Sequence, residues 1–158
     1  MICPDSFKGT LSADQAAAVI AGAISEINPT VQSIEMPIAD GGEGTLQALI
    51  KATNGQLVEV CVYDPLGKLV QAHYGVLGDG ETCVIELAQA SGLLLVPLEK
   101  RNPFKATTYG TGQLIFAALE AGYRKFIVCL GGSATNDAGM GMLQALGARF
   151  LNEKGELL

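Results

Sequence analysis

Hydrophobic and polar residues alternate with helical spacing in the first part of the chain. Ser12 and Gln15 have the spacing of a capping box, and apolar residues follow at intervals of three and four. This pattern predicts a helix over 12–27, which ends at an Asn-Pro pair because the residue before proline avoids the helical conformation. A short strand over 32–36 and a second helix over about 45–54 are expected next.

The hydrophobic period then changes to two, which is typical of strands. Apolar residues alternate over 57–62, and two further strands are expected over 68–77 and 82–87. Turn sequences rich in Gly, Pro and Asp separate them, so the three strands form a β-meander. A helix over about 111–121 follows, and the continuous apolar run at 126–130 is typical of a buried parallel strand. A short helix after it ends before a glycine.

The alternation of strands and helices on either side of the meander predicts an α/β fold. We expect a mainly parallel, helix-flanked sheet of Rossmann or flavodoxin-like type, with the meander belonging to a second α/β lobe. The first lobe comprises residues 1–55 and 88–147, and the incomplete second lobe comprises residues 56–87 and 148–158. The short first strand and a final hairpin turn at 152–155 further predict a fragment of a longer protein.

Composition excludes several classes of function. The chain has 158 residues, enough for one domain that buries roughly 70% of its unfolded surface. Its net charge is −6 and its basic residues are scattered, which argues against nucleic acid as a partner. No apolar run is long enough for a membrane span, and no signal peptide is recognised. The four cysteines lack C-x-x-C spacing, so we expect buried, reduced thiols and a cytoplasmic protein.

Three loops combine small or acidic polar residues between a strand and a helix, at residues 4–8, 40–45 and 131–137. In an open α/β sheet such loops meet at the carboxyl ends of the strands, where ligands bind. Helix N-termini and glycines admit phosphate there, so we expect the three loops to form one site. A carboxylate beside a phosphate needs a cation or takes up a proton, which indicates Mg²⁺ ligation or general-base catalysis. Four acidic residues are candidates for these roles: Asp5, Asp40, Glu43 and Asp137.

Each feature also has a simpler interpretation. The glycine pairs at 41–42 and 131–132 are typical of tight turns, and Asp40 and Asn136 are common helix caps. Lys8 is by default a solvated surface lysine. The standard nucleotide signatures are missing. No G-x-x-x-x-G-K-[ST] occurs, and the G-x-G sequences at 42–44 and 139–141 have Gln47 and Gln144 in place of the third glycine of the dinucleotide fingerprint.

Six short motifs nevertheless occur together in a fixed order, at residues 4–9, 39–45, 64–67, 86–88, 109–112 and 131–137. The set resembles the bacterial glycerate kinase family of type I, and it extends through essentially all 158 residues. Ala138 is a departure, because many relatives have a second glycine there. Family members are much longer, so the resemblance covers their N-terminal part. It implies two α/β domains and phosphorylation of D-glycerate by ATP with Mg²⁺, with 2-phosphoglycerate as the expected product.

The chemistry of the loops suggests a role for each candidate residue. Lys8 is expected to bind a phosphate or the glycerate carboxylate, and Asp40 or Asp137 to act as the base or as the Mg²⁺ ligand. Further residues are expected to bind substrate or phosphate: Asp5, Ser6, Gly41, Gly42, Glu43, Gly131, Gly132, Ser133, Thr135 and Asn136. Two alternatives stay open, a non-catalytic lobe that binds a ligand or partner and an oxidoreductase with a nonstandard dinucleotide loop. A homo-oligomer is a further expectation.

Overall fold

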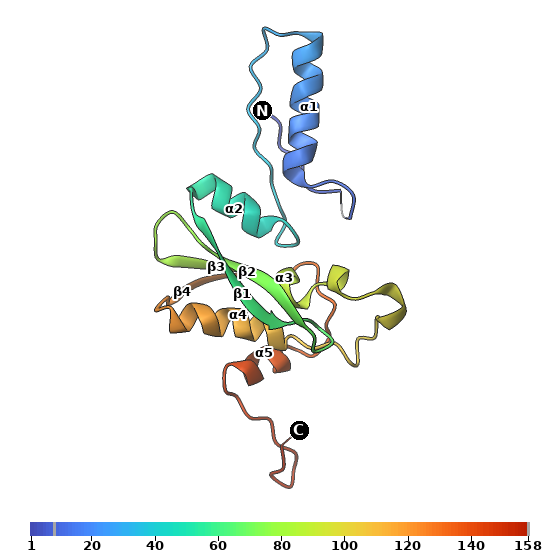
Figure 1. The fold of residues 1–158 in the computed structure, drawn as a ribbon, viewed down its shortest axis with the longest axis vertical. Helices are drawn as coiled ribbons and strands as arrows, with labels where there is room; N and C mark the ends of the chain where they lie inside the picture. The colour runs from blue at the N-terminus through green and yellow to red at the C-terminus, as the bar shows by residue number, and fades with distance from the viewer. Residues whose placement is uncertain (8, 158) are drawn as a thin grey trace.

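The structure is a computed structural model that describes residues 1–7 and 9–157 (Figure 1). Lys8, one of the predicted site residues, lies outside the described residues. The described helices and strands are, in chain order, α1 (Ala13–Ile27), α2 (Thr45–Thr53), β1 (Gln56–Tyr63), β2 (Leu69–Val76), β3 (Thr82–Glu86), α3 (Ala88–Ser91), two 3₁₀ turns (Leu93–Leu95 and Leu98–Lys100), α4 (Tyr109–Glu120), β4 (Lys125–Cys129) and α5 (Met140–Ala145).

The strands form one four-stranded sheet in the order β1-β2-β3-β4. β1 pairs with β2 along its whole length in antiparallel register, and β2 pairs with β3 in the same sense. β3 and β4 pair in parallel from Thr82–Lys125 to Glu86–Cys129. The predicted α/β class is confirmed, but the parallel arrangement is confirmed only for this last pair. Short turns join the meander strands, and a short turn can only connect antiparallel neighbours.

Helices cover both faces of the sheet. On one face, Ile85 of β3 belongs to a buried cluster with Leu114 and Ala118 of α4. On the other face, Val84 packs with Leu46 of α2. Successive side chains of a strand point to opposite faces, which explains why neighbouring residues of β3 join different clusters. β3 is therefore buried on both faces, and α2 and α4 lie on opposite sides of it (Figure 1).

The expected strand at 126–130 is present as β4, but the prediction that it is buried is wrong. Ile127 and Val128 are 41% and 40% exposed, and within β4 only Cys129 is buried. The reason is position, because β4 has a single neighbour in the described sheet and lies at its edge. An apolar run predicts a strand from local sequence, whereas burial also requires a neighbouring element that the run does not specify.

The N-terminal segment lies beyond α2, away from the sheet (Figure 1). α1 begins with the predicted capping box, in which the Gln15 backbone N–H donates to the Ser12 hydroxyl and the Ser12 N–H donates to the Gln15 side chain. The strand expected at 32–36 is reduced to a single parallel bridge between Ile2 and Glu35, because only the short segment around Ile2 pairs with it. Val19 in α1 is 65% exposed.

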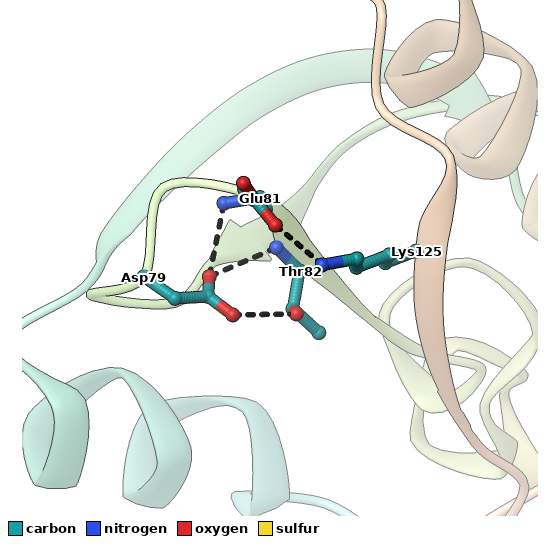
Figure 2. A network of polar contacts seen from close by, with 4 residues as sticks. All are labelled: Asp79, Glu81, Thr82 and Lys125. Atoms are coloured by element: carbon teal, nitrogen blue, oxygen red, sulfur yellow. Dashed lines mark hydrogen bonds and ion pairs between the residues drawn. The ribbon is translucent and has the colours of Figure 1, made fainter.

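A polar network closes the turn between β2 and β3 (Figure 2). The Asp79 carboxylate accepts hydrogen bonds from the backbone N–H groups of Glu81 and Thr82, both at 2.9 Å, and from the Thr82 hydroxyl at 2.6 Å. These bonds lower the pKa of Asp79 to about 2. Glu81 forms an ion pair with Lys125, which ties the start of β3 to the start of β4.

The described structure also bears on the expectations about cysteines and membranes. All four thiols are free, but burial holds only for Cys83 and Cys129, since Cys3 and Cys61 are exposed on irregular or edge segments. None of the described helices combines the length and the hydropathy that crossing a bilayer requires. The meander shares a sheet with β4, and the division of the chain into two lobes stays a prediction.

Candidate functional site

Two glycine-rich loops, residues 40–44 before α2 and residues 131–139 after β4, are in direct contact. The Gly131 N–H donates a 2.7 Å hydrogen bond to the Gly41 carbonyl. A Cβ atom on Gly131 would lie 2.5 Å from the Gly42 Cα, so no other residue fits without movement of the backbone. A Cβ atom on Gly132 would lie 2.5 Å from the Glu43 carboxylate. The fold thus brings together two of the three loops that the sequence singled out.

The first of these loops is held in place by side chains on both sides. The Gly42 N–H donates to Asp40 Oδ1 at 3.1 Å, and the Gly41 N–H donates to the Thr45 hydroxyl at 3.0 Å. These two bonds fold the loop back on itself as it enters α2. Asp40 remains exposed, so its other carboxylate oxygen is open to a ligand.

A buried carboxylate binds the first turn of α2, directly after the same loop. Glu86, at the carboxyl end of β3, is only 1% exposed and accepts the Leu46 N–H of α2 at 2.8 Å. Burial raises the pKa of Glu86, and hydrogen bonds from Leu46 and Gln89 offset part of this increase. An anionic group is favourable at a helix N-terminus, where backbone N–H groups are unpaired. Glu86 belongs to a motif recognised in the sequence, but its role was not predicted because it depends on a contact 40 residues away.

The second loop is anchored to the segment after α3. The Leu93 N–H donates to the Gly132 carbonyl at 2.8 Å, and the Ala134 N–H donates to the Ser91 carbonyl at 2.9 Å. Within the loop, the hydroxyl groups of Ser133 and Thr135 are 2.8 Å apart and share a hydrogen bond. Both hydroxyls are therefore fixed near each other at the loop surface, and Asn136 next to them is exposed.

Asp137 is placed differently from the other acidic candidates. Its Oδ2 accepts the backbone N–H of Thr108 and the hydroxyl of Thr108, both at 2.8 Å, and the Gly141 N–H at 3.2 Å. Its Oδ1 accepts the Gly139 N–H at 3.1 Å. Burial by itself would raise the pKa of Asp137, but these hydrogen bonds hold it below its ordinary value. The carboxylate thereby joins the start of α4 to the start of α5, and its role as base or metal ligand stays a prediction.

A cavity of about 510 Å³ opens beside the first loop, and we call it the N-terminal cavity. Three predicted site residues line it, namely Asp5, Ser6 and Glu43, together with Thr10, Leu11, Gln47 and Leu94, which were not predicted. Its volume lies in the range of small-molecule sites, roughly 300–1,000 Å³. Thr10 and Leu11 directly follow the 4–9 motif, which was a signal for them, whereas nothing in the local sequence indicated Leu94.

Other candidate residues lie outside the N-terminal cavity. Ser133 and Thr135 line a second cavity of about 270 Å³. Leu94 lines the first cavity and Leu93 the second, so the two cavities are neighbours on either side of this turn. Five of the predicted residues thus line one of the two cavities, whereas the other described candidates line neither, namely Asp40, Gly41, Gly42, Gly131, Gly132, Asn136 and Asp137.

The two predicted Mg²⁺ ligands fit a metal ion to different degrees. Among the described residues, no group of three or more His, Cys, Asp or Glu side chains lies close enough to hold an ion. Mg²⁺ is commonly bound by one or two carboxylates together with substrate phosphates, so a single free carboxylate is sufficient for such a site. Asp40 fits this requirement, because the backbone occupies one of its oxygens and it is exposed. Asp137 fits poorly, because both of its oxygens already accept hydrogen bonds.

Comparison with known proteins gives a consistent result. The model of the Glycerate kinase family matches residues 1–158. Over 155 residues, the chain is 54% identical to a protein named Glycerate kinase from Bacillus subtilis and 51% identical to one named Glycerate 2-kinase from Escherichia coli. Each match covers 98% of this chain and 41% of the relative. The chain therefore spans about two fifths of the length of these relatives.

A solved structure extends the similarity to the fold. The crystal structure described as a glycerate kinase 2 from Salmonella typhimurium LT2 is 49% identical and superposes with a TM-score of 0.79. The match covers 99% of this chain and 42% of that one. The likeness thus extends over nearly the whole of this chain.

Proposed function

Because the chain belongs to the glycerate kinase family, we propose that the complete protein transfers a phosphoryl group from ATP to D-glycerate. One structural observation carries the proposal. Two glycine-rich loops touch through the Gly131–Gly41 hydrogen bond, beside a cavity that contains Asp5, Ser6 and Glu43. The chain spans about two fifths of its relatives, so the activity is proposed for the complete protein.

The chemistry of phosphoryl transfer fits these residues. The protein has mainly to position the two substrates and neutralise charge, with little covalent work of its own. Glycerate has two hydroxyl groups, and the carboxylates of Asp5 and Glu43 are acceptors for them in a cavity of suitable volume. Asp40 would hold Mg²⁺ or accept the proton of the attacking hydroxyl. Bound Mg²⁺ neutralises charge on the phosphate oxygens.

We further propose the 2-hydroxyl as the acceptor, which gives 2-phosphoglycerate. Support comes from the Escherichia coli relative, which is named Glycerate 2-kinase and is 51% identical over 98% of this chain. The relatives reported above are named as kinases, which favours phosphoryl transfer over the oxidoreductase alternative. Use of ATP is consistent with a cytoplasmic location, and a homo-oligomer stays a prediction.

The proposal is tested with the complete protein, ATP, Mg²⁺ and D-glycerate. ADP release measures turnover, and ³¹P NMR of the product distinguishes the 2-phosphate from the 3-phosphate. Asp40→Asn is expected to lower kcat about 10²–10⁴-fold, as removal of a catalytic base or of a metal ligand does. Asp79→Asn makes the same chemical change at the β2–β3 turn and should leave kcat unchanged (Figure 2).

The outcomes separate the alternatives. A complete protein that binds ADP and glycerate without turnover would support a non-catalytic role and contradict the proposal. Equal kcat values for Asp40→Asn and the wild-type protein would remove Asp40 from the reaction while leaving the activity itself in place. Formation of 3-phosphoglycerate would contradict only the regiochemistry.

A further inference from the structure

The second cavity has a composition that differs from the N-terminal cavity. It is formed by the 3₁₀ turn at Leu93, the segment 101–106 and the loop of Ser133 and Thr135. Among the described residues that line it, Arg101 is the charged one, and the remainder are apolar or neutral polar. Its volume is about 270 Å³. A cavity with one cation and several neutral hydrogen-bond donors is suited to an anion.

The Arg101 guanidinium is oriented by backbone groups. Its Nε donates to the Val96 carbonyl at 3.2 Å, and its Nη2 lies 3.4 Å from the Leu93 carbonyl. An arginine has five N–H donors, so these two contacts fix the plane of the group and leave the other donors for a ligand. Both carbonyls belong to the turn that forms one wall of the cavity. The side chain is thus held at the cavity by its own surroundings.

Two residues with hydroxyl groups line the same cavity as Arg101. Ser133 and Thr135 line the same cavity, and the Ser133 oxygen also accepts the Thr135 backbone N–H at 3.0 Å. The two hydroxyls share a hydrogen bond of 2.8 Å, and the Ser133 hydroxyl also lies 3.5 Å from the Thr135 carbonyl. When Ser133 is the donor of the shared bond, the Thr135 hydroxyl hydrogen is free to turn toward a ligand. The lining of the cavity therefore includes both a guanidinium and a hydroxyl donor.

The charge distribution along the chain points to the same conclusion. The protein has a net charge of −6 with ten basic residues, and three of these are Lys100, Arg101 and Lys105. The segment from 100 to 105 is thus locally basic in an acidic protein. Such a segment attracts anions that the rest of the surface repels.

We propose that the second cavity is a phosphate-binding subsite in which Arg101 is the charged partner. The guanidinium fork matches a phosphate group through two parallel hydrogen bonds, which a lysine cannot reproduce. The proposal deepens the proposed function and rests on it for the source of the phosphate. That source is either the nucleotide or the phosphorylated product, because both carry the same group.

The test measures equilibrium binding to the complete protein by isothermal titration calorimetry, with ADP in one arm and 2-phosphoglycerate in the other. Arg101→Ala is expected to weaken one of the two ligands about 10- to 100-fold, the loss typical of a charge-assisted hydrogen bond. Lys105→Ala removes the same charge from the same segment but does not line the cavity, and it is expected to change either affinity less than threefold. Arg101→Lys keeps the charge without the fork and should restore affinity only in part.

The result identifies the ligand. Weakened ADP binding assigns the subsite to the nucleotide, and weakened 2-phosphoglycerate binding assigns it to the product. Equal effects of Arg101→Ala and Lys105→Ala would overturn the proposal, because the loss would then reflect overall charge. Circular dichroism of each variant tests whether the fold is retained. D-glycerate, which carries no phosphate group, is the control ligand, and its affinity should not change in Arg101→Ala.

Binding and turnover also separate this proposal from the proposed function. A protein without kinase activity that still binds phosphate through Arg101 would refute the function and keep the subsite. A kinase whose ligand affinities are unaffected by Arg101→Ala would keep the function and refute the subsite.

Discussion

Gly131 occupies a position where two backbones approach each other too closely for a side chain. Its φ angle lies outside the left-handed region, so the requirement for glycine there is one of space and not of conformation. The nearest atoms to a Cβ would be backbone atoms of Gly42, which cannot rotate away as a flexible side chain can. The contact between the loops, on which the proposed site rests, therefore depends on a missing methyl group.

Gly131→Ala is expected to push the two loops apart. Overpacking of this kind costs about 1–3 kcal/mol in the free energy of unfolding, and urea denaturation measures it. Gly22→Ala is the matched control, because Gly22 lies exposed within α1 with open space around it. That change is expected to stabilise the protein by about 0.5–1 kcal/mol, since alanine favours helix. Equal effects of the two substitutions would contradict the close approach.

Asp137→Asn is expected to lower the free energy of unfolding by about 1–3 kcal/mol, because an amide NH₂ replaces an oxygen that accepts hydrogen bonds. Since the pKa of Asp137 is lowered by folding, its stabilisation is present above the ordinary carboxyl pKa and is lost as the pH falls through the lowered value. Urea denaturation between pH 3 and pH 7 measures both effects.

Asn136→Ala, at the exposed neighbouring position, is the control for this experiment and should change stability little. An Asp137→Asn protein as stable as the wild type at every pH would show that the carboxylate is not the link between the two helices. In that case a catalytic role for Asp137 would gain support.

At the scale of elements, features set by residues close in sequence were predictable, whereas the length and burial of strands, which depend on distant partners, were not. The capping box of Ser12 and Gln15 lies within four residues, so the sequence alone locates the start of α1. The prediction of a strand at 32–36 was wrong because the length of a strand depends on its pairing partner. Only the short segment around Ile2 pairs with these residues. β4 was located correctly, but its exposure depends on its place at the edge of the sheet.

The same distinction applies to the candidate site. The glycine loops were predictable because their composition is unusual within a few residues. The role of Glu86 was not, because its contact with Leu46 joins residues 40 positions apart. Arg101 was not predicted either, because the basic residues are scattered along the chain and only the fold brings Arg101 and Ser133 to the same cavity. Sequence thus predicts which segments carry the chemistry, whereas folding decides which residues face each other.

Glu86→Gln is expected to reveal the cost of the buried charge that holds α2. Burial raises the pKa of Glu86, so the folded protein binds more protons than the unfolded chain between about pH 4.3 and the raised value. The free energy of unfolding of the wild type should therefore fall as the pH rises through this window. Glu86→Gln has no carboxyl group to titrate at this position. The free energy of unfolding of the wild type, relative to that of the variant, should therefore decrease from pH 4 to pH 7.

Urea denaturation of both proteins across this range provides the measurement. Glu120→Gln, a change at an exposed position of α4, is the control for loss of a carboxylate. A difference between wild type and Glu86→Gln that stays constant with pH would contradict the role assigned to the buried carboxylate.

At the scale of the whole molecule, the two ends of the parallel pair β3–β4 carry different kinds of polar groups. The carboxyl ends of β3 and β4, at Glu86 and Cys129, lead into the loops that form the candidate site. The opposite ends carry the network of Asp79 and the ion pair of Glu81 with Lys125 (Figure 2). The loops at the first end carry the exposed Asp40, whereas the charged groups at the other end are bound to neighbouring groups of the chain.

This separation predicts that stability and function respond to different acidic residues. The pKa of Asp79, lowered to about 2, means that its stabilisation is complete above the ordinary value near 4 and is lost as the pH falls toward 2. Asp79→Asn should therefore lower the urea midpoint at pH 7 and make the midpoint less dependent on pH between 4 and 2, with KM for D-glycerate unchanged.

Asp40→Asn should show the opposite pattern, with turnover lost and the urea midpoint unchanged, because the Asp40 carboxylate is exposed and accepts only the Gly42 N–H. A loss of turnover in Asp79→Asn would show that the two ends of the sheet are coupled.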